Sequence, residues 1–369
     1  MFPTSLLALL AILLQPSSAQ DAPAVGDTTQ SLALVFSPPF LPPEVTPQTY
    51  PNYTLPPVQP SWQPPADSYN YTLFVFPTTE DTPTSANDTS SQGLRAVNGV
   101  VQLASNATDS SLVLRDPIEG WRRQWLVGGL NASTNYTVFT VEDRSQVVTG
   151  PVYLLTKNVS FPCTLVHSLP YCPFVSYAVP IPPPSQTDPS QLGTSLTQQT
   201  YAADDLPGEY TAILLSSLGN FSITLSSFAC GRDVYSPLKT CEDCYDAYRD
   251  WACAISFPRC ANTDVSALPR APLPAPALMP RTNMSRNTFP PLDQTYTELL
   301  PCIETCTMVD RSCPYFLQFG CPLPGVTAEF SYGVGFIDDA VHGRQGKGVP
   351  GAAEEYGYAW CNAGSSYDY

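Results

Sequence analysis

The chain has 369 residues, and its 16 basic and 32 acidic side chains give a formal net charge of −16 at pH 7. Nucleic-acid binding requires a basic surface that displaces counterions, so this composition argues against it. The length suffices for two hydrophobic cores. The 41 prolines predict long irregular connections, because proline fits neither helix interiors nor central strands.

The first residues have the features of a secretory signal peptide. Leu6–Leu14 is an apolar run of nine residues, followed by the small residues Ser17, Ser18 and Ala19. A membrane anchor is the alternative, but so short a run does not span the roughly 30 Å of hydrocarbon in a bilayer. We therefore expect residues 1–19 to be a signal peptide.

The number of cysteines and the number of N-glycosylation acceptors also indicate the secretory pathway. Twelve cysteines, an even number, suit an oxidising compartment. Nine Asn-x-Ser/Thr acceptors predict that N-linked glycans cover much of the surface. These acceptors are Asn52, Asn70, Asn87, Asn106, Asn131, Asn135, Asn158, Asn220 and Asn283.

Residues 20–68 form a Pro/Thr-rich lead-in, which predicts either an extended solvated stalk or a lead-in strand with turns. Residues 69–160 contain six short β-branched and aromatic runs separated by Gly, Asn, Asp and Pro, which predict an all-β, sandwich-like domain. The runs are YTLFVF, VVQLAS, SLVLRD, RQWLVGGL, YTVFTVE and VVTGPVYLLT. The passage WLVGGLNASTNYTVFTVED resembles part of a fibronectin-type sandwich in which a tyrosine braces a corner.

Residues 161–200 are expected to be a stapled loop and a linker, because Cys163 and Cys172 are close enough in sequence to bridge one local loop. Residues 201–325 are expected to form a cysteine-rich, mainly helical domain. Its first predicted helix covers 205–230, where apolar residues recur at helical spacing. Gly219, and the alternation of Phe221, Ile223 and Leu225, leave a strand as the alternative for the second half of that helix.

The next predicted helix runs from Tyr245 to Phe257 and ends at Pro258. A Pro-rich insertion covers 267–292. The segment TYTELLPCIETCTMVDRSCPYFLQFGCP then predicts a third helix, with Pro301 near its start. Residues 326–369 are a Gly-rich tail that carries the last cysteine.

Nine of the twelve cysteines lie between residues 230 and 321. The CxxC pair Cys241 and Cys244 is also compatible with a redox pair or half of a zinc site. However, a thioredoxin-type motif has few cysteines around it, and zinc needs reduced thiolates, which secretory conditions oppose. We therefore expect structural disulfides, each worth ~2–4 kcal/mol, which a helical domain with little apolar core needs. They involve Cys163, Cys172, Cys230, Cys241, Cys244, Cys253, Cys260, Cys302, Cys306, Cys313, Cys321 and Cys361, and their pairing is left open.

No catalytic, cofactor or metal site is expected. His167 and His342 are the two histidines, and neither lies beside a nucleophile motif. Carboxylate pairs such as Glu242 and Asp243 are adjacent in sequence and point different ways on regular structure. A cell-wall carbohydrate hydrolase built on the β domain is a third hypothesis, for which the sequence offers no facing carboxylate pair.

The carboxyl half resembles the fungal stretch-activated, calcium-permeable channel component family over residues 160–362. The resemblance rests on several passages in the same order along the chain. These are LVHSLPYCPFVSYAVP, NFSITLSSFAC, YSPLKTCEDCYDAYRDWACAISFPRC, YTELLPCIETCTMVDRSCPYFLQFGCP, SYG at 331–333 and WCN at 360–362. The cysteine-rich part is also similar to the auxiliary subunit of the animal sodium-leak channel and, more distantly, to Frizzled-type domains.

The resemblance implies an extracellular, glycosylated regulatory subunit that binds the pore-forming subunit of a four-repeat cation channel. Such a subunit supports stress- and pheromone-induced Ca²⁺ influx at the plasma membrane. The resemblance also implies that the protein passes through the endoplasmic reticulum. The alternative is a secreted Frizzled-like domain that binds a lipid or cell-wall ligand.

Four residues are of the types that anchor interfaces: Tyr245, Tyr248, Arg249 and Trp251. We expect them to contact the partner, although Trp251 also suits a core position. Asn283 is the one acceptor between residues 230 and 369, so this half is where we expect the partner to bind.

Overall fold

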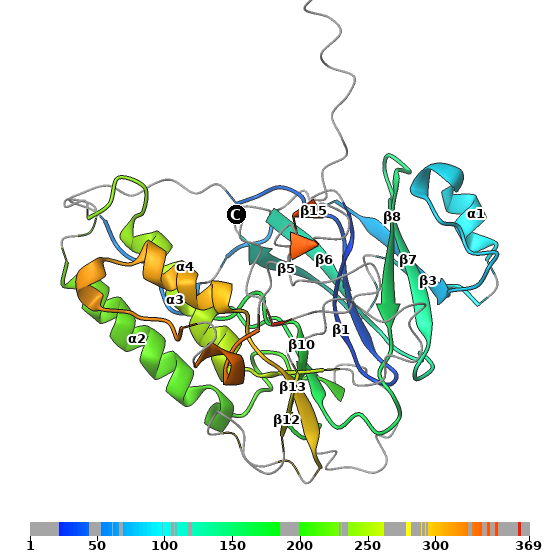
Figure 1. Cartoon of the computed structure of the whole chain (residues 1–369). Coiled ribbons are helices and arrows are strands. Elements are labelled where there is room, and N and C mark those ends of the chain that lie inside the picture. The colour runs from blue at the N-terminus through cyan, green and yellow to red at the C-terminus, as the bar shows by residue number, and fades with distance from the viewer. Residues whose placement is uncertain are drawn as a thin grey trace, which may run out of the picture.

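The computed structural model covers the whole chain, and the helices α2–α4 lie beside the larger β-sheets (Figure 1). The residues that the structure describes are 22–43, 53–60, 62–65, 69–97, 99–104, 107, 109–116, 120–184, 199–228, 230, 235–261, 278–281, 289, 292, 294–323, 327–333, 338–339, 344–345 and 361–362. The predicted signal peptide, residues 1–19, lies outside them.

Two four-stranded antiparallel sheets make up the N-terminal part. The first has the order β1-β2-β6-β5 and consists of β1 (Ala24–Thr28), β2 (Ala33–Phe36), β6 (Gly120–Val127) and β5 (Ser110–Asp116). The second has the order β4-β3-β7-β8 and consists of β4 (Val101–Ala104), β3 (Tyr71–Pro77), β7 (Asn135–Glu142) and β8 (Val148–Leu155). One hydrophobic cluster joins the sheets, with Val35 and Trp125 from the first and Leu73 and Val138 from the second.

Each sheet also buries its other face. Phe74, Phe76 and Phe139 pack around Leu94 of α1 (Ser91–Arg95) on the second sheet. On the first sheet, Leu34 packs with residues from the second half of the chain. Because β2 is buried on both faces, all four of its residues are apolar, as in other strands without a solvent face.

All six runs predicted as strands between residues 69 and 160 are strands β3 to β8. The predicted corner brace is also present, because the Tyr136 hydroxyl accepts a hydrogen bond of 2.8 Å from the backbone N–H of Asn131. The lead-in is not a solvated stalk between residues 24 and 36, where β1 pairs with β2 and β2 pairs with β6.

Residues 161–181 form a buried hairpin in place of the stapled loop expected there. β9 (Thr164–Val166) and β10 (Tyr177–Val179) pair in a hairpin whose strand residues are all buried. The loop between them contributes Leu169, Tyr171 and Cys172 to a core shared with the helices. Apolar residues between the prolines of this segment therefore line the boundary between the sheets and the helical part.

The first two predicted helices are present with different ends. α2 covers Ala212–Ser226, and the 3-10 turn η5 (Gly208–Tyr210) precedes it, so the helix begins seven residues later than expected. Its second half is helical, so the strand alternative was wrong, and Ile213 faces solvent with 58% of its surface exposed. α3 covers Cys241–Ser256 and begins four residues early because Thr240 and Asp243 form a reciprocal capping box.

The third predicted helix is shorter than expected. Tyr296–Leu299 is a strand, β13, at the centre of a three-stranded sheet with β11 (Arg259–Cys260) and β12 (Leu278–Arg281). α4 covers only Ile303–Ser312, and η6 (Tyr315–Leu317) follows it. Pro301 separates strand from helix, because proline disfavours helical backbone in the residue before it.

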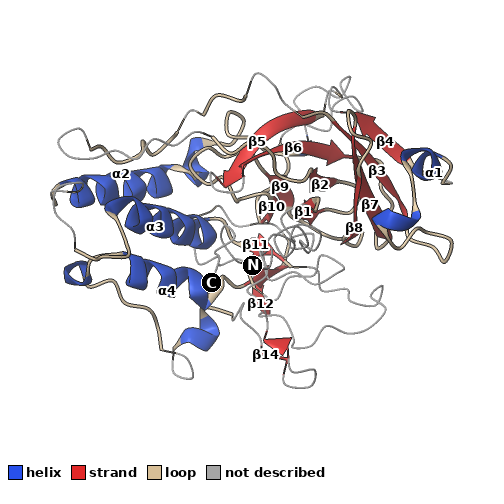
Figure 2. Cartoon of the chain, turned by 90° about the horizontal axis from the view of Figure 1, so that it is seen from above, coloured by secondary structure: helices blue, strands red, loops and turns tan. Residues whose placement is uncertain are grey.

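The remaining short elements are the 3-10 turns η2 (Ala86–Asp88) and η7 (Ala328–Phe330) and the strand pair β14 (Asp338–Asp339) and β15 (Arg344–Gln345). Figure 2 shows α2, α3 and α4 gathered at one end of the molecule, and the long strands, with α1, at the other.

Candidate partner-binding site on the cysteine-rich helices

The twelve cysteines form six disulfides, and none is free. The pairs are Cys163–Cys260, Cys172–Cys253, Cys230–Cys241, Cys244–Cys313, Cys302–Cys361 and Cys306–Cys321. The expected local bridge between Cys163 and Cys172 was wrong, because both residues reach 81 or more positions along the chain to β11 and α3. Short separation in sequence did not decide the pairing, since the hairpin that carries these cysteines is buried against distant elements.

The CxxC residues do not bond to each other: Cys241 bonds to Cys230 and Cys244 to Cys313. Glu304 lies close to the sulfur atoms of Cys302 and Cys361 in a group with metal-ligand residue types. Those two sulfurs form a disulfide and offer no thiolate to a metal. The cysteine arrangement is therefore a structural framework.

Three of the disulfides fix α2, α3, α4 and η6 to one another. Cys230–Cys241 joins the chain after α2 to the first residue of α3. Cys244–Cys313 joins α3 to the residue that follows α4, and Cys306–Cys321 joins α4 to the chain beyond η6. Side chains presented by these elements lose little conformational freedom on binding, which favours recognition.

Aromatic side chains from these elements meet at one surface. The Phe221 and Tyr248 rings stack with their centroids 3.7 Å apart, and the Trp251 ring lies 5.0 Å from that of Phe319. Phe228 and Phe316 form a second contact with centroids 4.6 Å apart. We define the aromatic surface as Phe221, Phe228, Tyr248, Trp251, Tyr315, Phe316 and Phe319.

This surface is partly open to solvent. Tyr315 is 91% exposed and Phe316 is 50% exposed, whereas the other members are half-buried. Aromatic residues are enriched at protein interfaces, and Trp and Tyr are enriched among the side chains that dominate their binding energy. The aromatic surface is therefore our candidate for partner binding.

The four predicted contact residues occupy different environments. Tyr245 is fully buried, and burial raises the pKa of its hydroxyl to about 12, so it belongs to the core beneath the surface. Tyr248 and Trp251 belong to the aromatic surface, and the Trp251 indole N–H donates to the Tyr332 hydroxyl at 2.9 Å. Trp251 thus has both a packing role and a partly exposed ring.

Arg249 is half-buried between two acidic side chains. Its guanidinium lies 2.9 Å from the Asp246 carboxylate and 3.4 Å from that of Asp250. Burial lowers the pKa of Arg249, but Asp250 and Asp246 outweigh that effect and hold it above its usual value. Because Arg249 is already paired within α3, it has less charge to offer a partner than the sequence suggested.

The sequence prediction missed Tyr315, Phe316 and Phe319. The signal was available, since these three aromatic residues fall between Cys313 and Cys321 in the passage CPYFLQFGC. On the continuous helix expected there, these three rings would share one face of that helix, since residues three and four apart are neighbours on a helix. In the structure, Phe319 instead packs against Tyr248 and Trp251 of α3, and Phe316 contacts Phe228, which follows α2. Tyr315 is the exposed neighbour of Phe316 in η6.

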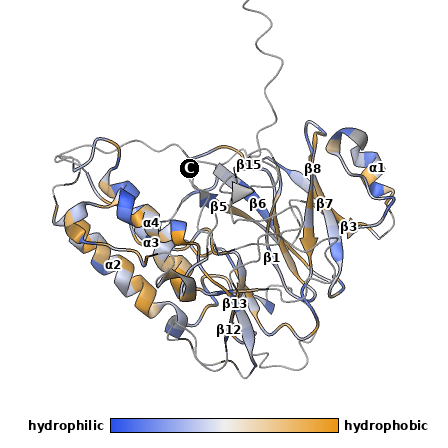
Figure 3. Cartoon of the chain, viewed as in Figure 1, coloured by the Kyte–Doolittle hydropathy of each residue, from blue (hydrophilic) through white to orange (hydrophobic). Residues whose placement is uncertain are grey.

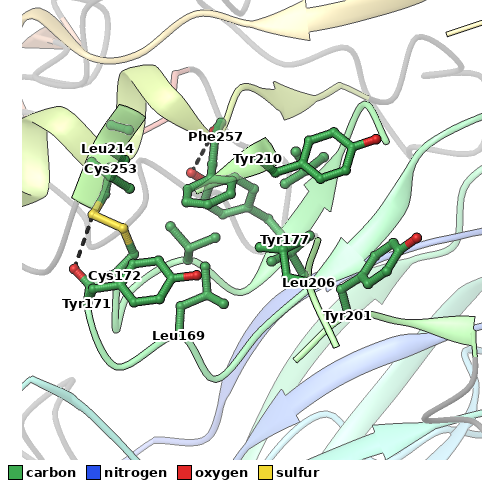
Figure 4. Close-up of a cluster of buried hydrophobic side chains, with 14 of the residues drawn as sticks. Leu169, Tyr171, Cys172, Tyr177, Tyr201, Leu206, Tyr210, Leu214, Cys253 and Phe257 are labelled. Atoms are coloured by element: carbon green, nitrogen blue, oxygen red, sulfur yellow. Dashed lines mark hydrogen bonds between the residues drawn. A yellow bond between two sulfur atoms is a disulfide. The ribbon is translucent and has the colours of Figure 1, made fainter. Parts of the chain in front are cut away.

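A buried core joins the helices to the hairpin β9–β10. Figure 4 shows Leu169, Tyr171 and Tyr177 facing Leu214 and Phe257, with the Cys172–Cys253 bond among them. The Tyr177 hydroxyl donates to the Phe257 carbonyl at 2.9 Å and accepts from the Asn362 amide at 3.1 Å. These contacts connect the helical end of the molecule to the hairpin β9–β10.

A buried ion network reinforces the same boundary. The Asp27 carboxylate on β1 lies 3.0 Å from the Lys157 amine and 3.0 Å from the Arg259 guanidinium. Burial raises the pKa of Asp27, but Arg259 and Lys157, with the N–H of Thr28, outweigh burial and hold it below its usual value. Arg259 precedes Cys260, so this network lies next to a disulfide between the two parts.

The predicted glycosylation acceptors differ in exposure. Asn70, Asn87, Asn131 and Asn220 are exposed, while Asn135 and Asn158 are half-buried. Asn52, Asn106 and Asn283 lie outside the described residues. Their glycosylation stays a prediction.

Among the helices that the structure describes, none combines the length and apolar character needed to cross a bilayer.

Comparison with known proteins places this framework in a family. The family described as "Stretch-activated Ca2+-permeable channel component" matches residues 13–347. The stretch-activated cation channel MID1 of Cryptococcus neoformans is 34% identical over 372 residues, which cover 92% of this chain and 59% of that protein.

Two further relatives are similar over shorter regions. The stretch-activated cation channel yam8 of Schizosaccharomyces pombe is 31% identical over 72% of this chain and 51% of its own length. The stretch-activated cation channel MID1 of Saccharomyces cerevisiae is 33% identical over 56% of this chain and 36% of its own length. The matches therefore cover between about a third and three fifths of these relatives. The chain belongs to the family of stretch-activated, Ca²⁺-permeable channel components.

Proposed function

We propose that this protein is an extracellular, glycosylated regulatory subunit of a plasma-membrane calcium channel. It binds the pore-forming subunit of a four-repeat cation channel and supports the Ca²⁺ influx that stress and pheromone induce. Membership of the channel-component family supports the association with a channel. The aromatic surface is the observation that supports binding through the cysteine-rich helices.

The positions of the predicted N-glycosylation acceptors also favour the aromatic surface as the binding face. Asn220 lies exposed on α2, on the same helix as Ile223, which is 71% exposed. A glycan there would keep the outer side of α2 away from a protein partner. Figure 3 shows several apolar residues along α2, of which Ile213 and Ile223 are exposed. By contrast, no acceptor lies within η6 or within the loop between Cys313 and Cys321.

We also propose the finer architecture that the resemblance implies. The two sheets that share one core form a β-sandwich-like domain, and the helices with their disulfides form a Frizzled-like cysteine-rich domain. The expected domain limits, 69–160 and 201–325, stay proposals, as does the signal peptide. Strands β1 and β2 belong to the first sheet although they precede residue 69.

Co-purification of the pore-forming subunit tests the binding face. Tyr315→Ala combined with Phe316→Ala removes two exposed rings without touching a disulfide. We expect roughly tenfold less channel to be recovered with this variant from fungal membranes in mild detergent, because exposed aromatic anchors carry much of the binding energy.

Ile223→Ala is the matched control, because it removes a similarly exposed apolar side chain from the face that carries Asn220. It should leave recovery of the channel unchanged. Undiminished recovery with the double variant, or an equal loss with Ile223→Ala, would contradict the proposed face. Both variants should be secreted with all cysteines oxidised.

A further inference from the structure

A wide groove opens where the sheets meet the cysteine-rich part. Its volume is about 710 Å³, within the range of roughly 300–1,000 Å³ that is typical of ligand sites. One wall is the turn between β1 and β2, residues 29–32, and the other walls are residues 159–164 and the segment that leads to β13. The groove therefore contacts both parts of the molecule.

The lining is polar but uncharged. The amide side chains of Gln30, Gln199 and Gln294 line the groove together with Ser and Thr hydroxyls, and Phe161 and Leu292 provide apolar surface. No described lining residue carries a formal charge, although the net charge of the chain is −16. Amides and hydroxyls beside an aromatic ring fit a neutral sugar, which has hydroxyl groups on its edges and C–H groups on its faces.

A sugar acceptor lies at the rim of this groove. Asn158, Val159 and Ser160 form the sequon, and the latter two residues line the groove themselves. The turn is closed because the Phe161 N–H donates to the Asn158 carbonyl at 3.2 Å. The Ser160 hydroxyl donates to Asn158 Oδ1 at 3.1 Å, which leaves Nδ2, the atom that carries the sugar, without a hydrogen bond to any described residue.

We propose that the N-linked glycan of Asn158 folds back into this groove and spans the boundary between the two parts. This inference rests on the glycosylation that belongs to the proposed function. The core N-acetylglucosamine residues contact Phe161 with their C–H faces and the glutamines with their hydroxyl and acetamido groups. The glycan then covers the region of the buried ion network, since the Lys157 amine lies 5.6 Å from the Phe161 ring centroid.

Glycan release from the native protein tests this inference. The full-length protein, secreted from a glycosylating host, is treated with a peptide-N-glycosidase, and mass spectrometry measures the release rate at each site. We expect release at Asn158 to be roughly tenfold slower than at exposed Asn131. A tenfold equilibrium preference for the docked glycan over the free glycan would leave it open to the enzyme about a tenth of the time. After denaturation the two rates should become equal.

Variants that keep the sequon separate docking of the glycan from local shielding of Asn158. Gln294→Ala removes an amide from the groove and should raise the release rate at Asn158 toward that at Asn131. Gln102→Ala, which removes an exposed glutamine from β4, is the matched control and should change nothing.

Three outcomes would overturn the inference. The first is equal release at Asn158 and Asn131 in the native protein, and the second is slow release that Gln294→Ala leaves unchanged. The third is an unoccupied Asn158 while other acceptors carry glycans, which leaves the proposed function intact. Absence of glycans at every acceptor would contradict the glycosylation in the proposed function as well.

Discussion

The two parts of this molecule are stabilised by different means. The part before residue 160 has no cysteine, and its strands β1–β8 bury apolar residues on both faces of two sheets. The part after residue 160 has all twelve cysteines, which form six disulfides, and three of these disulfides link the helices to one another. Regular strand pairing suits a scaffold, whereas cross-linked short elements suit a surface whose aromatic side chains must stay in place.

The boundary between the two parts combines both means. It has the Cys172–Cys253 and Cys163–Cys260 disulfides, a shared apolar core and the ion network around Asp27. If disulfides stabilise the helical part and apolar burial stabilises the sheets, then removing a disulfide and altering a buried side chain should change the unfolding free energy by different amounts.

A large loss of stability is expected on removal of the disulfide that joins the hairpin to α3. Replacing Cys172 and Cys253 together by alanine opens a loop of 81 residues, and chain-entropy arguments give a loss of about 4.5 kcal/mol of unfolding free energy. The pair Cys306 and Cys321 closes only 15 residues, and the same replacement there should cost about 3 kcal/mol. Chemical denaturation measures both, and equal stability of all three proteins would contradict a framework role.

The next effect concerns the buried carboxylate. Asp27→Asn removes the negative charge between Lys157 and Arg259, and we expect a loss of about 3 kcal/mol because two buried cations then face each other. Asp204→Asn, at an exposed aspartate, should change the unfolding free energy by less than about 0.5 kcal/mol. A similar small effect of Asp27→Asn would show that the network does not hold the boundary.

A smaller effect should appear as a pH dependence. Burial lowers the pKa of His167 to about 4, below the usual value of 6.5, so the folded protein binds a proton less readily than the unfolded chain. The contribution of His167 to the unfolding free energy is therefore nearly independent of pH above about 6.5, and it decreases as the pH falls from 6.5 toward 4. We expect the unfolding free energy to fall by about 2 kcal/mol between pH 7 and pH 5.

His167→Gln provides the control for this pH dependence. Glutamine keeps polar atoms near Gln124 and Thr200, which lie 3.2 Å from the two ring nitrogens, but it does not titrate. The variant should show a flatter profile between pH 7 and pH 5. An unchanged slope would assign the pH dependence to other groups.

The smallest effect tests the sheets alone. Tyr136→Phe removes the acceptor of the Asn131 N–H bond and should lower the unfolding free energy by about 1 kcal/mol. Tyr69→Phe removes a hydroxyl from a tyrosine that is 42% exposed, and it should have almost no effect. Channel binding should be unchanged in both variants, because neither residue belongs to the aromatic surface.

The strands could be predicted because the residue types within each run indicate a buried strand without information from distant parts of the chain. YTLFVF alternates little, since β3 is buried on both faces, yet its β-branched and aromatic residues and its flanking turns identify it. β1 and β2 were harder to place, because a Pro-rich segment follows them directly and its composition resembles a stalk. Their membership of the first sheet depends on pairing with β6, which lies more than 80 residues away.

The site could be predicted only in part, for a different reason. Tyr248 and Trp251 could be identified from a helix with aromatic residues on one face, whereas Phe316 and Phe319 reach them only through the fold of η6. The pairing of Cys306 with Cys321 decides where those rings lie, and twelve cysteines allow many pairings. Local patterns carry no information about which pairing forms.

Purification of the tagged, wild-type protein from fungal membranes in mild detergent tests the central claim most directly. Mass spectrometry of the purified material identifies what accompanies it. The account predicts a four-repeat cation channel as the main partner, recovered less well with the Tyr315 and Phe316 variant. Recovery of the protein alone from the medium or the cell-wall fraction, with an extractable acyl ligand, would contradict it and favour a secreted ligand-binding domain.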